Sequence, residues 1–81
     1  MEMGNRICIV DHDLTSRGYL RECLEREGHQ VVILENGSQI KPALSAEHFD
    51  IFILNVDTPG VREKNFLLNI KNAHPLRILL V

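Results

Sequence analysis

The chain alternates between short apolar runs and segments in which apolar residues recur at helical spacing. The apolar runs cover residues 6–10, 29–34, 49–54 and 77–81 and contain many aliphatic and β-branched side chains. Runs of this kind, with apolar residues on both faces, are typical of buried strands in a parallel sheet. The pattern therefore predicts buried strands at all of these positions, including the last.

The segments 14–27, 38–46 and 64–72 between these strands predict helices. Their apolar residues recur at steps of about three and four positions, as on one face of a helix: Leu20, Cys23 and Leu24; Ile40 and Leu44; Phe66, Leu67 and Ile70. Asp13 is in the position of an N-cap, and Gly28 follows the first helix where a left-handed residue is expected. Pro75 is expected to stop the last helix.

Strands that alternate with helices predict an α/β fold, with a doubly wound parallel sheet between two layers of helices. In such sheets the functional residues lie at the carboxyl ends of the strands. The sequences that follow the first and third strands, Asp11-His12-Asp13 and Asn55-Val56-Asp57, are both polar. These two segments are the candidates for a functional site.

Composition narrows the class of protein. The 81 residues carry a formal net charge of −2 and allow one small domain, which we assign to residues 1–81. The apolar runs are too short to span a membrane and the amino terminus has no signal-peptide pattern, so we expect a cytoplasmic protein. Lys and Arg are scattered among the acids, which argues against direct binding of nucleic acid by this segment. A disulfide between Cys8 and Cys23 remains an alternative, although we expect a reducing environment.

Several segments resemble the receiver domain of bacterial two-component response regulators, the CheY-like family. They are ICIVDHD, LRECLEREGHQVVILENG and FDIFILNVDTPG, and the family pattern can be laid over residues 6–81. The resemblance implies a flavodoxin-like fold and a regulatory role in phosphorelay signal transduction. It also implies a histidine kinase or another signalling protein as partner, and an output domain that is fused or acts downstream.

In that family, acidic residues after the first strand and an aspartate after the third surround Mg²⁺, and this aspartate accepts the phosphoryl group. Carried over to this sequence, Asp11 matches the first acid and His12 is in the position of the second. Asn55 is in the position of the phosphoacceptor. Asp57 matches the residue whose backbone carbonyl reaches the metal, and Pro59-Gly60 matches the turn that follows.

These substitutions change the expected chemistry. The side-chain amide of Asn55 carries no full charge, and its nitrogen lone pair is delocalised, so it cannot serve as the carboxylate nucleophile. His12 offers a nitrogen ligand, which Mg²⁺ disfavours, and any Mg²⁺ would depend on Asp11 and Asp57. Glu63 is in place of a family glycine. We therefore expect a receiver that is not phosphorylated at the usual position and is not an enzyme, or a pseudo-receiver that binds a partner independently of phosphorylation.

Two alternatives keep the acids in a chemical role. In the first, Asp57 accepts the phosphoryl group itself, or Asp57 and Asp13 restore the metal site. In the second, Asp11, Asp13 and Thr15 form the D-x-D-x-T motif of haloacid-dehalogenase-type phosphatases, in which the first Asp is the nucleophile and the second the acid or base. That motif also needs a later Lys and further acids, for which the chain has little room.

The receiver pattern continues beyond the final segment RILLV. The family's switch Ser or Thr, its later lysine and its last strand and helix match no residue here, so the resemblance implies a domain that is truncated at its carboxyl end. The fourth strand would then lie at an edge of the sheet with an uncovered apolar face. Exposed apolar edges pair with other chains, so we expect a homo-oligomer or a chain of marginal stability.

Overall fold

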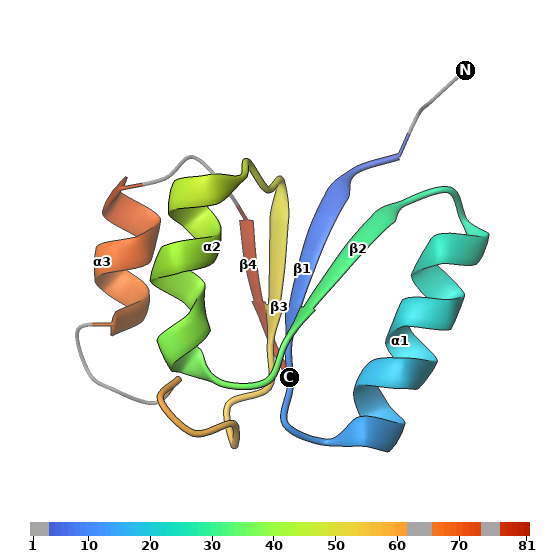
Figure 1. The fold of residues 1–81 in the computed structure, drawn as a ribbon, viewed down its shortest axis with the longest axis horizontal. Helices are drawn as coiled ribbons and strands as arrows, with labels where there is room; N and C mark the ends of the chain where they lie inside the picture. The colour runs from blue at the N-terminus through green and yellow to red at the C-terminus, as the bar shows by residue number, and fades with distance from the viewer. Residues whose placement is uncertain (1–3, 62–65, 74–76) are drawn as a thin grey trace.

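The computed structural model describes residues 4–61, 66–73 and 77–81, in which strands and helices alternate as predicted (Figure 1). The elements in chain order are β1 (Arg6–Val10), α1 (Leu14–Arg26), β2 (Gln30–Leu34), the 3₁₀ turn η1 (Gly37–Gln39), α2 (Ile40–Ala46), β3 (Ile51–Leu54), α3 (Phe66–Ala73) and β4 (Arg77–Leu80). The start of the last helix at Lys64, its stop at Pro75 and the substitution at Glu63 lie outside the described residues.

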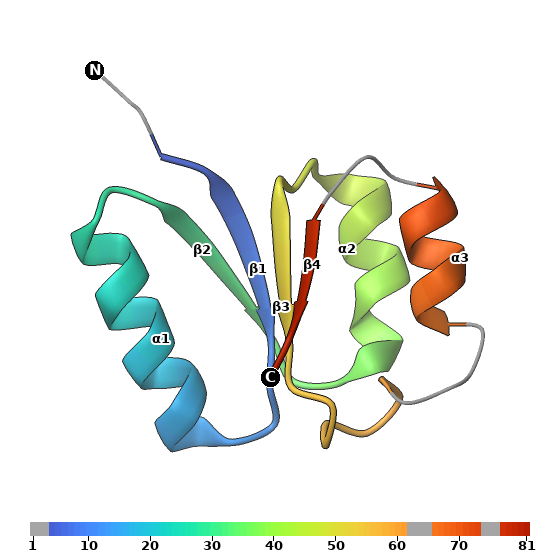
Figure 2. The same ribbon diagram turned by 180° about the vertical axis from the view of Figure 1, so that it is seen from behind.

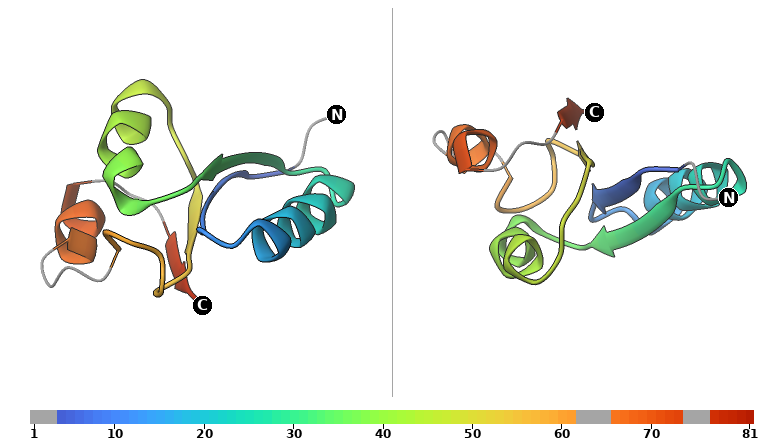
Figure 3. Two further views of the ribbon diagram at one scale, coloured as in Figure 1. Left: turned by 60° about the horizontal axis from the view of Figure 1, so that its bottom comes forward. Right: turned by 90° about the horizontal axis from the view of Figure 1, so that it is seen from above.

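The sheet has the strand order β2-β1-β3-β4, and every pair of neighbouring strands is parallel. Ile9 in the central strand β1 pairs with Ile33 of β2 on one side and with Ile53 of β3 on the other. Helix α1 lies on one side of the sheet, and α2 and α3 lie on the other (Figures 2 and 3). The predicted α/β fold with a doubly wound parallel sheet is confirmed.

The core consists of a cluster on each face of the sheet, because successive side chains of a strand point to opposite faces. Ile7, Ile9 and Ile53 form the cluster under α1, where Leu20 and Leu24 pack against them. The cluster on the other face is larger, and it comprises Cys8, Val10, Ile40, Phe49, Phe52, Leu54, Val61 and Ile70. Both faces of β1 and β3 are therefore buried, which explains why these strands are apolar at nearly every position.

Helix α1 begins and ends where its caps predict. The side chain of Asp13 accepts a hydrogen bond from the backbone N–H of Thr15 at 3.3 Å, so Asp13 is the N-cap. At the other end Gly28 has a φ of 93°, the left-handed conformation that favours glycine. The exposed face carries ion pairs such as Arg26 with Glu22, at 3.4 Å. Because such pairs on a solvated helix contribute little, the caps and the packing of Leu20 and Leu24 against the sheet define this element.

The prediction that β4 is buried is wrong. Leu79, Leu80 and Val81 are 53%, 55% and 60% exposed, and only Ile78 packs against the larger cluster. The reason is position rather than composition, because β4 is the outermost of the described strands and, among them, pairs with β3 alone. The predicted edge location of this strand is confirmed.

Among the described residues both cysteines are free, with Cys8 buried, so the alternative of a disulfide is wrong.

The predicted third strand begins too early. Phe49 and Asp50 precede β3, yet Phe49 is buried against Phe52 with its ring edge to face at 5.4 Å. Asp50 accepts the backbone N–H of Arg6 through Oδ2 at 2.8 Å, which fixes the amino end of β1. Apolar character at position 49 therefore reflects core packing by a residue outside the strand.

No helix among the described residues is long and apolar enough to cross a membrane.

Candidate functional site

Asp11 is the buried acid of the candidate site. It follows β1 directly, and its backbone N–H donates to the carbonyl of Leu34 at 3.0 Å, which holds the residue in line with the sheet. Its side chain is 1% exposed. Oδ1 accepts hydrogen bonds from the backbone N–H of Asp13 at 2.9 Å and from Nδ2 of Asn55 at 3.0 Å. Oδ2 is buried and has no hydrogen-bond partner among the described residues.

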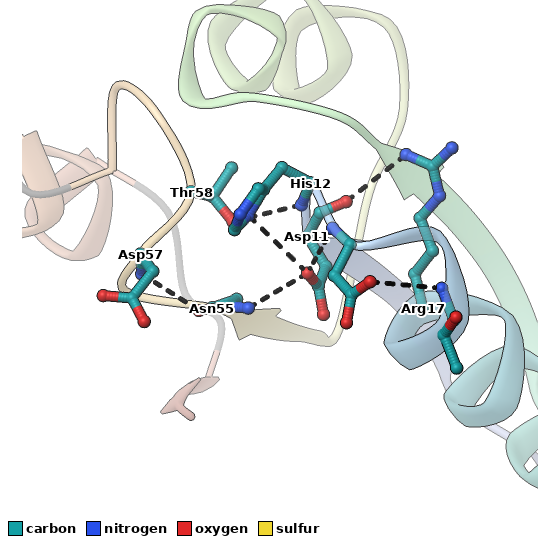
Figure 4. A network of polar contacts seen from close by, with 8 residues as sticks. Asp11, His12, Arg17, Asn55, Asp57 and Thr58 are labelled. Carbon is teal, nitrogen blue, oxygen red and sulfur yellow. Dashed lines mark hydrogen bonds and ion pairs between the residues drawn. The ribbon is translucent and has the colours of Figure 1, made fainter.

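Asn55 follows β3 and faces Asp11 across the ends of the two central strands (Figure 4). Its backbone N–H donates to the carbonyl of Val10 at 2.9 Å. In the side chain, Nδ2 donates to Asp11, and Oδ1 accepts the backbone N–H of Asp57 at 2.9 Å. The two partners require opposite roles of the two amide atoms, so the network itself fixes the orientation of the amide.

His12 and Thr58 form a second contact between the same two loops. The backbone N–H of His12 lies 3.3 Å from the hydroxyl oxygen of Thr58, and the ring Nδ1 lies at the same distance from that oxygen. Thr58 is 2% exposed, and its own N–H donates to the carbonyl of Asn55 at 3.0 Å. The His12 ring is half-exposed, with Nδ1 4.0 Å from Oδ1 of Asp11. The loop after β1 and the loop after β3 are therefore joined by two polar contacts, Asn55 with Asp11 and Thr58 with His12.

Arg17 connects helix α1 to this cluster. Nη1 donates to the backbone carbonyl of Asp11 at 3.4 Å, and Nη2 lies 3.3 Å from Oε2 of Glu35, which follows β2. The Arg17 side chain is only 14% exposed. Sequence reasoning identified neither Arg17 nor Thr58 as a site residue. Both lie within seven residues of a strand's end, which was the only signal that could have indicated them.

The remaining acids do not converge on Asp11. The backbone of Asp57 belongs to the cluster through Asn55, but the carboxylate of Asp57 is exposed and points away from Asp11 (Figure 4). The carboxylate of Asp13 caps helix α1 by accepting the Thr15 N–H. The acids of the D-x-D-x-T motif at residues 11–15 thus make hydrogen bonds that support the end of β1 and the start of α1.

The residues around Asp11 do not fit a magnesium site. Mg²⁺ prefers several oxygen ligands in near-octahedral geometry, and carboxylates usually supply the negative charge that balances the cation. Here Asn55 presents an N–H donor to Asp11, and its Oδ1 is engaged by the Asp57 N–H. Among the described residues no group of three His, Cys, Asp or Glu side chains could hold a metal ion. The unpartnered Oδ2 of Asp11 offers one oxygen ligand.

Comparison with known proteins gives distant similarity. No family model matches the chain. The chain is 29% identical over 70 residues, 86% of its length, to the DNA-binding transcriptional regulator NtrC of Escherichia coli and of Salmonella typhimurium. It is 27% identical over 56 residues, 69% of its length, to the CAI-1 autoinducer sensor kinase/phosphatase CqsS of Vibrio cholerae.

The matched regions are small parts of these relatives. The chain spans 15% of the length of the NtrC proteins and 8% of CqsS. The chain is therefore similar to a small part of a transcriptional regulator and to a small part of a sensor kinase/phosphatase.

Proposed function

We propose that the chain is a receiver-type regulatory module of bacterial two-component signalling that acts without phosphoryl transfer at Asn55. The parallel α/β fold and the similarity to a transcriptional regulator and a sensor kinase support this class. The clustering of Asp11 and Asn55 at adjacent strand ends supports it further, because functional residues of open α/β sheets lie there.

The observation that carries the proposal is the hydrogen bond from the Asn55 amide to Asp11. An aspartyl phosphoacceptor presents a carboxylate oxygen as nucleophile, next to a cation that neutralises the phosphoryl oxygens. Asn55 presents an amide, and it directs the N–H donor at the one buried acid of the cluster. The residues at the strand ends therefore form a polar network around Asp11 Oδ1, rather than a nucleophile with its metal, although Asp11 Oδ2 has no partner among the described residues.

The partner we propose is a histidine kinase or another signalling protein, bound through surface contacts, with a fused or downstream output domain. The near-neutral charge of −2 gives no basic surface for phosphate backbones, so we assign no direct nucleic-acid binding to this segment. A cytoplasmic, non-enzymatic role belongs to the same proposal.

The decisive experiment is incubation with acetyl phosphate and Mg²⁺ followed by intact-mass measurement. We expect the wild-type chain to gain no phosphoryl adduct, while a receiver with an aspartate at the acceptor position is phosphorylated in the same tube. A stoichiometric adduct on the wild type would overturn the proposal. If that adduct is lost in Asp57→Asn and kept in Asp13→Asn, Asp57 is the acceptor.

A further inference from the structure

We propose that the side-chain amide of Asn55 takes the place of a cation against Asp11 Oδ1, so that the two strand-end loops are held together without a divalent metal even though Asp11 Oδ2 has no described partner. The inference rests on the proposed function and concerns the state of the same site. It follows from the mismatch between the residues present and the magnesium site that the receiver resemblance implies.

The first step concerns the compensation of a buried carboxylate. Asp11 is 1% exposed, and burial of a carboxylate is costly unless hydrogen bonds or opposite charges replace the lost water. The described partners of Asp11 Oδ1 are two N–H donors, the backbone of Asp13 at 2.9 Å and Nδ2 of Asn55 at 3.0 Å. Charge-assisted hydrogen bonds of this kind are stronger than neutral ones. Asn55 therefore supplies the positive end of a dipole where a metal ion would supply a full charge.

The second step concerns the loops that this amide joins. Through Oδ1 the amide accepts the backbone N–H of Asp57, so one side chain ties the loop after β3 to the acid after β1. The contact of His12 with Thr58 joins the same loops a second time. Both connections are made by atoms of the chain itself. A cation is not needed to hold this end of the sheet together.

The test compares thermal unfolding of the chain in EDTA and in millimolar MgCl₂. For the wild type we expect the same Tm in both buffers. The variant Asn55→Asp keeps the acceptor for the Asp57 N–H but places a carboxylate oxygen against Asp11 Oδ1. We expect its Tm in EDTA to fall by about 5–10 °C, since an unsatisfied or repelled buried group is costly in a domain of this size. We expect MgCl₂ to restore at least part of that loss.

Asn36→Asp is the matched control, because it makes the same amide-to-acid change at a turn whose Oδ1 accepts the Ser38 N–H at 3.0 Å. We expect its Tm to stay near that of the wild type and to be insensitive to MgCl₂. A rise in the wild-type Tm with MgCl₂ would overturn the inference and needs no variant. An unchanged Tm of Asn55→Asp in EDTA would also overturn it. Neither result depends on phosphoryl transfer, so the proposed function is tested separately by its adduct.

Discussion

The backbone N–H of Gly37 donates to the carbonyl oxygen of Pro59 at 2.8 Å, which joins the turn after β2 to the loop after β3. The two loops approach so closely that a Cβ atom on Gly37 would clash with the carbonyl group of Gly60. Gly60 itself has a φ of 84°, a conformation that side chains disfavour. The loop of residues 55–60, which carries the candidate site, is therefore also held by the turn that follows β2.

We predict that Gly37→Ala destabilises the chain by about 1–3 kcal/mol, because the new methyl group must displace backbone atoms rather than a flexible side chain. Urea unfolding measures the change. Gly18→Ala is the matched control, since a Cβ on Gly18 in the middle of α1 meets no atom within 4 Å. That variant should gain up to about 1 kcal/mol of stability from helix propensity. A loss of similar size in both variants would contradict the packing argument.

The buried hydroxyl of Thr58 gives a second prediction. Thr58→Val keeps the shape of the side chain but removes the acceptor of the His12 backbone N–H. We expect a loss of about 1–2 kcal/mol in the free energy of unfolding, the usual cost of leaving a part-buried donor unpaired. Thr58→Ser retains the oxygen and should keep most of the stability. Equal losses in both variants would show that the methyl group matters and the hydroxyl does not.

Burial raises the pKa of the Cys8 thiol from 9.0 to about 12. The folded chain keeps this thiol protonated, whereas the unfolded chain ionises it above about pH 9. The contribution to stability is therefore complete below pH 9 and is lost as the pH rises toward 12. Urea unfolding between pH 8 and pH 11 should show a steeper alkaline loss for the wild type than for Cys8→Ala. Parallel curves would contradict the assignment of this loss to Cys8.

The exposed edge of the sheet predicts self-association. Leu80 on β4 is 55% exposed, and an outermost strand offers unpaired backbone groups beside this apolar side chain. We expect the wild type to show concentration-dependent mass in sedimentation and Leu80→Lys to reduce it. Leu68→Lys makes the same change at a 57% exposed position of α3 and should leave association unchanged. A wild-type monomer at high concentration would refute the prediction.

The sequence predicts most of the fold because each local signal agrees with the packing. Asp13 and Gly28 bracket α1 as their capping preferences require, and the apolar runs of β1 and β3 match burial on both faces. The prediction that residues 77–81 are buried fails for a physical reason, since the same aliphatic composition suits a buried strand and an exposed edge strand. Strand order across the sheet decides between them, and periodicity within one strand carries no such information.

The candidate site divides in a similar way. That Asp11 and Asn55 come together is predictable, because the carboxyl ends of adjacent parallel strands meet at one edge of the sheet. The roles of Thr58 and Arg17 are not, since they depend on which way a loop and a helix turn after the strand ends. The orientation of the Asn55 amide likewise depends on the Asp57 N–H, a contact that only the folded loop creates.

The central position of β1 also bears on the order in which the strands pair during folding. Strands β1 and β2 are separated by a single helix, so we expect them to pair early, and we expect β1 to pair later with β3, where Ile7 lies opposite Ile51. Closing a longer loop costs more entropy and slows formation of the contact. The polar cluster spans this late step, because Asp11 and Asn55 are 44 residues apart. Its assembly therefore reports that the central sheet has formed, and a partner that reads these loops would bind only the folded chain.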